Sequence, residues 1–288
     1  MVMGENVKCP VCGASNTFPL AELSQSKLVV CDDCRLRFKH PMPDEKTLES
    51  LYADEESHED FEYYRGFRLK TYQKVLDYLS SHRGIASALD IGSGFGWFLE
   101  LANERGIKSY GVEISDEKRK TYQSKNSKGV VVKNLDELPA DARFDLITLF
   151  DVLEHIPDWR GLLESVRYYL KDNDSWLVIR VPDTSSMLIR LIEYLYRLTG
   201  GKVNAPLERL YKYHVYGFNL NNLRIVLNKT SMELCCYYRE SGKNLKKLKR
   251  KIWAKNPIVR VVIILIAKLA EALKQEDELI LFARKCKK

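Results

Sequence analysis

Residues 88–100 read ALDIGSGFGWFLE, and this stretch decides how the rest of the chain is interpreted. Three glycines, Gly92, Gly94 and Gly96, alternate with other residues between an apolar run and a segment with helical spacing. A glycine-rich turn between a strand and a helix lets the backbone approach a nucleotide-like ligand closely. The stretch therefore predicts a strand–turn–helix unit of a parallel sheet, with a ligand site at the turn.

Strand-like and helix-like segments alternate beyond this turn, and they predict an α/β fold with a doubly wound, mostly parallel sheet. Expected strands are 87–91, 109–114, 129–134, 144–150, 175–181, 233–240 and 278–285, and expected helices are 61–79, 96–106, 116–126, 158–170, 186–198 and 222–229. The helix at 186–198 is amphipathic and carries Arg190, Glu193 and Arg197 on one face. In sheets of this kind, ligands bind beyond the carboxyl ends of the strands.

The N-terminal segment carries a metal-binding pattern. Cys9, Cys12, Cys31 and Cys34 form two C-x2-C pairs that are separated by eighteen residues. This spacing is typical of a tetrahedral site in which four thiolates hold a structural zinc ion. Cys235, Cys236 and Cys286 are scattered and are interpreted as inert thiols.

The glycine turn differs from the dinucleotide fingerprint G-x-G-x-x-G, because its spacing is G-x-G-x-G. Asp90 precedes the first glycine by two residues, where a carboxylate would repel a pyrophosphate but accept hydrogen bonds from an ammonium group. Glu113 follows the next strand and is placed to accept the two hydroxyls of a ribose. These features favour S-adenosylmethionine (SAM), which has an ammonium group and no phosphate.

Two longer stretches resemble a known family. LDIGSGFGWFLELANERGIKSYGVEIS (89–115) is similar to the first two motifs of class I SAM-dependent methyltransferases, and 144–183, which contains DVLEHIPD, resembles their fourth-strand region. DVLEHIPD is typical of the branch that includes ubiquinone-biosynthesis O-methyltransferases and many sugar or small-molecule methyltransferases. The resemblance implies a Rossmann-like, seven-stranded sheet. It extends loosely through 213–233, where Gly217 replaces a histidine that the pattern often carries.

The resemblance also implies roles for individual residues. Backbone at Gly92, Ser93, Gly94 and Gly96 would approach the methionyl part of SAM, Asp90 would hold the turn or the amine, and Glu113 would hold the ribose. Asn134 and Leu135 fall where the family lines the adenine, although loop capping and packing explain them equally. Phe150 and Asp151 fall near the sulfonium.

Two histidines are candidates for a general base, which methyl transfer needs only when the acceptor must lose a proton. His155 either serves as this base or caps and packs the following helix. His214 lies in the aromatic stretch YKYHVYGF and is either a base, a substrate contact or a structural histidine.

The sequence divides into a zinc-knuckle module at 1–40, a linker and helical lid at 41–84, and a methyltransferase domain at 85–288. Insertions are expected at about 184–230 and 240–276. Tyr63, Tyr64 and Arg65 are candidates for the lid over the cofactor or for the first turn of an amphipathic helix.

The expected function is transfer of a methyl group from SAM to a small molecule, a sugar or a lipid-linked glycan. A basic tract and an apolar helix within 243–273 form either a core helix or a peripheral membrane contact. Two alternatives stay open: an RNA methyltransferase that uses the zinc module and this tract, and a non-catalytic scaffold that binds zinc or SAM. We expect a cytoplasmic protein, because the chain lacks a secretory pattern and an apolar run of the ~20 residues needed to cross a membrane.

Overall fold

The computed structural model describes residues 7–24, 26–44, 47–48, 61–125, 128–202, 204–240, 261, 265 and 277–286. Almost all of the 243–273 segment, whose packing the sequence leaves open, therefore lies outside the described residues, as do the side chains of Tyr63 and Tyr64. None of the helices within the described ranges is long and apolar enough to cross a membrane.

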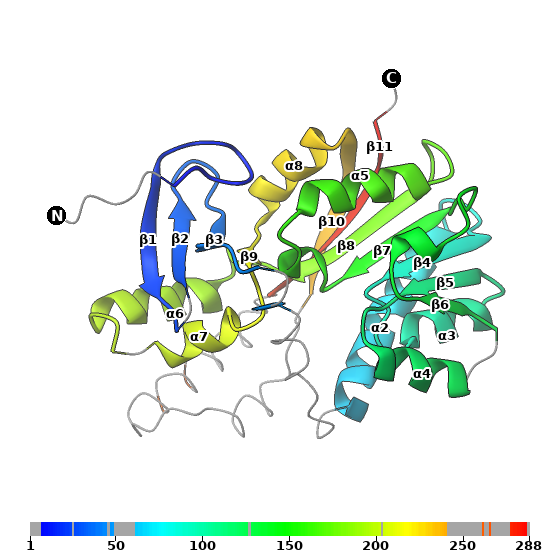
Figure 1. The fold of residues 1–288 in the computed structure, drawn as a ribbon, viewed down its shortest axis with the longest axis horizontal. Coiled ribbons are helices and arrows are strands. Elements are labelled where there is room, and N and C mark those ends of the chain that lie inside the picture. The colour runs from blue at the N-terminus through cyan, green and yellow to red at the C-terminus, as the bar shows by residue number, and fades with distance from the viewer. Residues whose placement is uncertain are drawn as a thin grey trace.

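A seven-stranded sheet forms the centre of the molecule, in the order β10-β11-β8-β7-β4-β5-β6 (Figure 1). Its strands from β6 to β8 run parallel, and β11 and β10 are antiparallel to their neighbours. The bounds are β4 (Ser87–Ile91), β5 (Lys108–Val112), β6 (Val130–Val132), β7 (Leu146–Phe150), β8 (Trp176–Pro182), β10 (Met232–Glu240) and β11 (Glu278–Lys285). The doubly wound, mostly parallel sheet predicted from the sequence is confirmed.

Helices cover both faces of this sheet (Figure 1). One face packs against α5 (Trp159–Tyr169) and α8 (Leu220–Lys229), through side chains such as Leu163 and Val226. The other face packs against α2 (Phe61–Ser80) and α3 (Trp97–Glu104), through side chains such as Leu76 and Phe98. Strands buried on both faces are mostly apolar, and all five residues of β7 are buried, with Thr148 as the one polar residue among them.

The remaining helices are α4 (Asp116–Lys125), α6 (Met187–Leu198) and α7 (Ala205–Leu210), together with two short 3-10 turns, η2 (Leu135–Glu137) and η3 (Leu153–His155). Of these, α4 and α6 match predicted helices, whereas α7 and the two 3-10 turns were not predicted. His155 lies in η3 and does not cap α5, because the cap is Asp158, whose side chain accepts a hydrogen bond from the Gly161 amide at 3.0 Å. The capping role considered for His155 is therefore wrong.

A second, four-stranded antiparallel sheet joins the N-terminal module to the main domain. Its strands are β1 (Thr17–Glu22), β2 (Lys27–Cys31), β3 (Arg37–His40) and β9 (Tyr216–Gly217), in that order. The first three strands belong to the cysteine-rich segment, and β9 comes from the chain that leads into α8. The module therefore shares its sheet and part of its hydrophobic core with the main domain, and residues such as Phe38 and Phe218 belong to the same cluster.

Gly217 makes this junction possible. It pairs with Arg37, and a Cβ built on it would lie 2.6 Å from Tyr211 Oη and 2.7 Å from Thr184 Cγ2. Tyr211 and Thr184 are both buried, so neither moves easily. The same Cβ would lie 3.2 Å from Arg37 Cβ on β3, so the glycine that departs from the family pattern also lets β3 approach.

We expect Gly217→Ala to lower the free energy of unfolding by about 1–3 kcal/mol, because the added methyl group overpacks a closed site. Urea unfolding of the whole chain measures this change. The matched control is Gly84→Ala, since a Cβ at Gly84 meets no atom within 4 Å. Equal stability of the two variants would contradict the packing argument.

Candidate active site

The glycine loop leaves β4 at the carboxyl edge of the sheet. Gly92, Gly94 and Gly96 all have positive φ, at 75°, 55° and 78°, where residues with side chains are strained. A Cβ at Gly92 would lie 2.4 Å from Val152 Cγ2, whereas a Cβ at Gly94 would meet no atom within 4 Å. The loop is therefore packed against the protein at Gly92 and open at Gly94, where a ligand can approach the backbone.

Two carboxylates flank this loop. Asp90 is the penultimate residue of β4, is 2% exposed, and accepts a hydrogen bond from Thr148 Oγ1 at 2.7 Å. Burial raises the pKa of Asp90 to about 7, against the opposing effects of Thr148 and the Arg68 guanidinium. The buried Ser93 Oγ beside the loop has no hydrogen-bond partner among the described residues.

Glu113 holds the loop from the neighbouring strand. Its Oε2 accepts a hydrogen bond from the Gly94 amide at 2.7 Å, and its Oε1 accepts one from the Ser115 amide at 2.9 Å. Each carboxylate oxygen can accept more than one hydrogen bond, so Glu113 can hold the loop and still receive ligand hydroxyls.

The strands β6 and β7 bring the other predicted cofactor residues to the same edge of the sheet. Asn134 is exposed and precedes η2 without a capping hydrogen bond from its side chain, and Leu135 is half-buried. The Phe150 ring lies 4.6 Å from that of Tyr72 and 5.5 Å from that of Phe98, measured between centroids, so it packs in the core beneath the site.

Asp151 is held by two arginines that sequence reasoning missed. Its carboxylate forms ion pairs with Arg180 on β8 and, at 2.5 Å, with Arg68 on α2. Although burial opposes ionisation, these two guanidinium groups lower the pKa of Asp151. Arg180 also lies near Glu240 on β10 and Glu278 on β11, at 3.6 and 3.5 Å, so one buried charge network links these two strands to α2.

His155 and His214 lie together, with ring centroids 4.7 Å apart. His155 Nδ1 is 3.2 Å from the Tyr213 carbonyl oxygen, so it donates the hydrogen bond and Nε2 faces the Glu154 carboxyl at 4.0 Å. Burial lowers the pKa of His155 to about 4, and burial raises the pKa of Glu154 well above its usual range. No described residue hydrogen-bonds to the Glu154 carboxyl oxygens.

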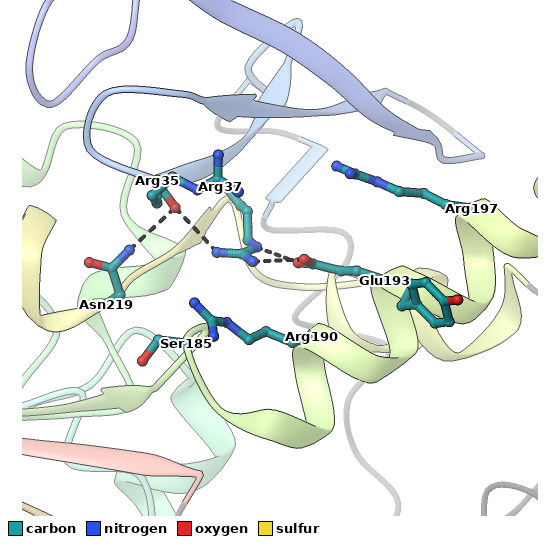
Figure 2. A pocket seen from close by; sticks show the side chains of 8 residues that line it. Arg35, Arg37, Ser185, Arg190, Glu193, Arg197 and Asn219 are labelled. Atoms are coloured by element: carbon teal, nitrogen blue, oxygen red, sulfur yellow. Dashed lines mark hydrogen bonds and ion pairs between the residues drawn. The ribbon is translucent and has the colours of Figure 1, made fainter.

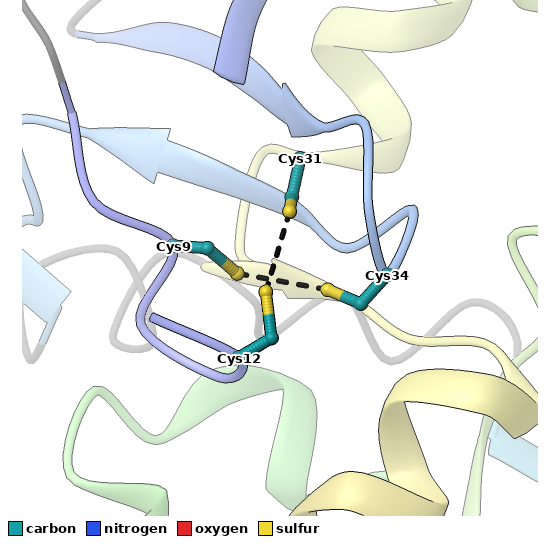
Figure 3. A group of neighbouring side chains, drawn as sticks. All are labelled: Cys9, Cys12, Cys31 and Cys34. Atoms are coloured by element: carbon teal, nitrogen blue, oxygen red, sulfur yellow. Dashed lines mark hydrogen bonds between the residues drawn. The ribbon is translucent and has the colours of Figure 1, made fainter. Parts of the chain in front are cut away.

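The four N-terminal cysteines converge as their spacing suggested (Figure 3). Sγ of Cys9 lies 3.6 Å from Sγ of Cys34, and Sγ of Cys12 lies 3.5 Å from Sγ of Cys31. A tetrahedral zinc ion with Zn–S bonds of about 2.3 Å requires sulfur separations of about 3.8 Å. All four are free thiols, so this donor set fits zinc.

Comparison with known proteins identifies the family. A family model described as a methyltransferase domain matches residues 64–241. This chain belongs to that methyltransferase family. It is 26% identical over 135 residues to the ubiquinone biosynthesis O-methyltransferase of Xanthomonas oryzae pv. oryzae. The aligned region covers 43% of this chain and 56% of that protein. The chain thus spans about half the length of the curated relatives it matches.

Solved structures agree on the fold. A SAM-dependent methyltransferase from Archaeoglobus fulgidus is 24% identical with a TM-score of 0.51, over 79% of this chain and 100% of that one. The magnesium protoporphyrin IX methyltransferase of Synechocystis PCC 6803 is 13% identical with a TM-score of 0.52, over 83% of this chain and 93% of that one. The methyltransferase has the Rossmann-like fold of class I SAM-dependent enzymes.

The raised pKa of Asp90 has a measurable consequence for stability. Its folded pKa of about 7 exceeds its ordinary value of 3.8, so the folded state binds the proton more tightly than the unfolded chain does. The stability that this group contributes is therefore present at low pH and is lost as pH rises toward about 7. Asp90→Asn cannot ionise. We expect its free energy of unfolding, relative to the original chain, to increase between about pH 5 and pH 8.

Urea unfolding at several pH values measures this difference, and the exposed loop variant Asp141→Asn gives the baseline. A difference between Asp90→Asn and the original chain that does not change with pH would refute the burial argument.

Proposed function

We propose that this methyltransferase transfers a methyl group from SAM to a small-molecule acceptor, such as a sugar or a lipid-linked glycan. The observation that carries the proposal is the loop of three positive-φ glycines between Asp90 and Glu113 at the carboxyl edge of the sheet. A loop with an open backbone and two flanking carboxylates suits a ligand that has an ammonium group and a ribose. It disfavours a pyrophosphate, which the Asp90 carboxylate would repel.

The residues fit SAM in three respects. Gly94 leaves room for close approach, and the unpartnered Ser93 Oγ and the buried Asp90 carboxyl provide polar groups for the methionyl part. Glu113 is placed to accept the ribose hydroxyls while it holds the loop through the Gly94 amide. When bound, SAM supplies an activated methyl group, so the protein mainly aligns the acceptor and excludes water.

The curated relatives are named as O-methyltransferases, which supports a hydroxyl acceptor here. A hydroxyl must lose its proton during transfer. His155, with a pKa of about 4, is a weak base at neutral pH, so we assign the proton to His214. His155 then positions His214 through their ring contact, since its own Nδ1 is fixed by the Tyr213 carbonyl.

We also propose that Cys9, Cys12, Cys31 and Cys34 hold one structural zinc ion. The ion would fix the ends of β2 and the turn before β3, and those strands form the sheet that β9 completes. A module of this size has too small a core to fold well alone, so metal binding supplies folding free energy.

Glu113→Ala is expected to weaken binding of S-adenosylhomocysteine, the demethylated product, by about 1.5–3 kcal/mol. The variant loses the ribose contacts and releases the Gly94 amide. Isothermal titration calorimetry measures the affinity, and Glu104→Ala, an exposed glutamate at the end of α3, is the matched control. Binding of NADH in place of S-adenosylhomocysteine would reject the cofactor assignment.

Purified protein is expected to contain about one zinc ion per chain, because four thiolates close a tetrahedral site. Mass spectrometric metal analysis should show that Cys31→Ser loses the ion and that Cys235→Ser, which changes an exposed thiol, retains it. Folded protein without zinc, prepared in the absence of chelators, would exclude a zinc site.

His214→Ala is expected to lower turnover by ~10²-fold or more while S-adenosylhomocysteine still binds, since this is the size of a lost general base. The assay follows labelled methyl groups from SAM into the polar and lipid fractions of an extract of the source cells. His82→Ala, an exposed histidine after α2, is the control. Normal turnover of His214→Ala from about pH 6 to about pH 9 would show that another group takes the proton.

A further inference from the structure

A cavity of about 430 Å³ lies between the N-terminal module and α6. Four arginines line it (Figure 2). Two of them come from the module: Arg35 directly follows Cys34, and Arg37 begins β3. The other two, Arg190 and Arg197, project from α6 toward the module. The cavity exists only because the module packs on α6, so neither part forms it alone.

The cavity carries an excess of positive charge. Arg37 is neutralised, because its guanidinium forms a buried, two-point ion pair with Glu193, whose second contact is 2.7 Å long. Arg35 pairs at 2.6 Å with Asp32, which does not line the cavity. With Arg37 and Arg35 paired, Arg190 and Arg197 are the arginines of the lining for which no described carboxylate forms an ion pair.

The two arginines of α6 carry the positive charge that remains among the described residues of the lining. No carboxylate in the described ranges pairs with Arg190 or Arg197, and the Arg197 guanidinium instead lies 5.6 Å from the Phe18 ring centroid. They are seven residues apart, so their Cα atoms are separated by about 10 Å along the helix. Like charges gathered in a concave site repel one another, and an anion that reaches both relieves this repulsion.

The cavity is close to the proposed acceptor side of the sheet. Ser185, which follows the carboxyl end of β8, and Asn219, five residues after His214, both line it. Asn219 also ties the wall together, since its amide donates hydrogen bonds to the carbonyl oxygens of Cys34 and Arg35. A group bound here therefore lies next to the segment that carries His214.

The shape favours a compact anion over a long one. A single strand of nucleic acid follows an extended basic groove with aromatic side chains on which bases stack. This cavity is open to solvent on one side, and its volume suits a small ligand group. Guanidinium groups bind phosphate oxygens in pairs of hydrogen bonds, and a diphosphate ester carries a charge on each of two phosphates, which matches two unbalanced arginines.

We propose that this arginine cavity binds the diphosphate group of the acceptor. That the bound diphosphate is part of the methyl acceptor rests on the methyltransferase function proposed above. That the cavity binds a diphosphate does not rest on it. Two sources share this chemistry: a soluble nucleoside diphosphate ester and a polyprenyl diphosphate.

Calorimetry with inorganic pyrophosphate at low salt tests the cavity directly. The original chain is expected to bind, and Arg190→Gln and Arg197→Gln are each expected to weaken the affinity at least tenfold. Arg224→Gln, an exposed arginine on α8 outside the cavity, is the matched control and should change it less than twofold. Absence of pyrophosphate binding, or equal binding by Arg190→Gln and Arg224→Gln, overturns the proposal.

Further titrations separate the remaining possibilities. UDP binding tighter than farnesyl diphosphate binding supports a nucleotide-linked acceptor, and the reverse supports a polyprenyl-linked one. If a single-stranded RNA oligonucleotide binds, if its affinity depends on Arg190, and if pyrophosphate does not bind, the cavity recognises nucleic acid and not a diphosphate. S-adenosylhomocysteine is titrated into the same proteins. If it fails to bind while pyrophosphate binds through Arg190, the methyltransferase function fails and the anion site stands.

Discussion

The parallel register of β4, β5, β7 and β8 is the constraint on which the site depends. It aligns the carboxyl ends of these strands, so that the glycine loop, Glu113, Asp151 and the start of α6 emerge at one edge. Hydrogen bonds then fix the loop from two sides, through Asp90 to Thr148 and through Glu113 to the Gly94 amide. Because these contacts come from different strands, a shift in register would separate them.

The N-terminal module extends this arrangement beyond the sheet. Two contacts attach the module next to the segment that carries His214. One is the pairing of β3 with β9, for which Gly217 leaves room, and the other is the buried Arg37–Glu193 ion pair. Breaking such a pair by removing one partner is strongly destabilising, because it leaves a buried charge. The four thiols therefore belong to a module that is attached next to the segment that carries His214.

Features of the site that depend on a short segment could be predicted from the sequence, and contacts between residues far apart in the chain could not. The glycine spacing, the apolar strands and the cysteine spacing encode structure within short segments, so the fold, the position of Glu113 and the convergence of the four thiols followed from them. The partners of Asp151 come from α2 and β8, and Glu193 meets Arg37 from far along the chain. From the sequence alone these arginines are indistinguishable from surface arginines, because the neighbouring residues do not indicate which distant carboxylate each one pairs with. Capping, one of the roles considered for His155, is wrong because Asp158, three residues on, takes that role.

A crystal structure of the zinc-loaded protein with S-adenosylhomocysteine tests the central claim most directly: that the cofactor edge and the module enclose one acceptor site. The expected result has the ribose on Glu113, the thioether sulfur on the side of His214, zinc within the four thiolates, and β3 paired with β9. A thioether that points away from His214, or a module detached from β9, would contradict it.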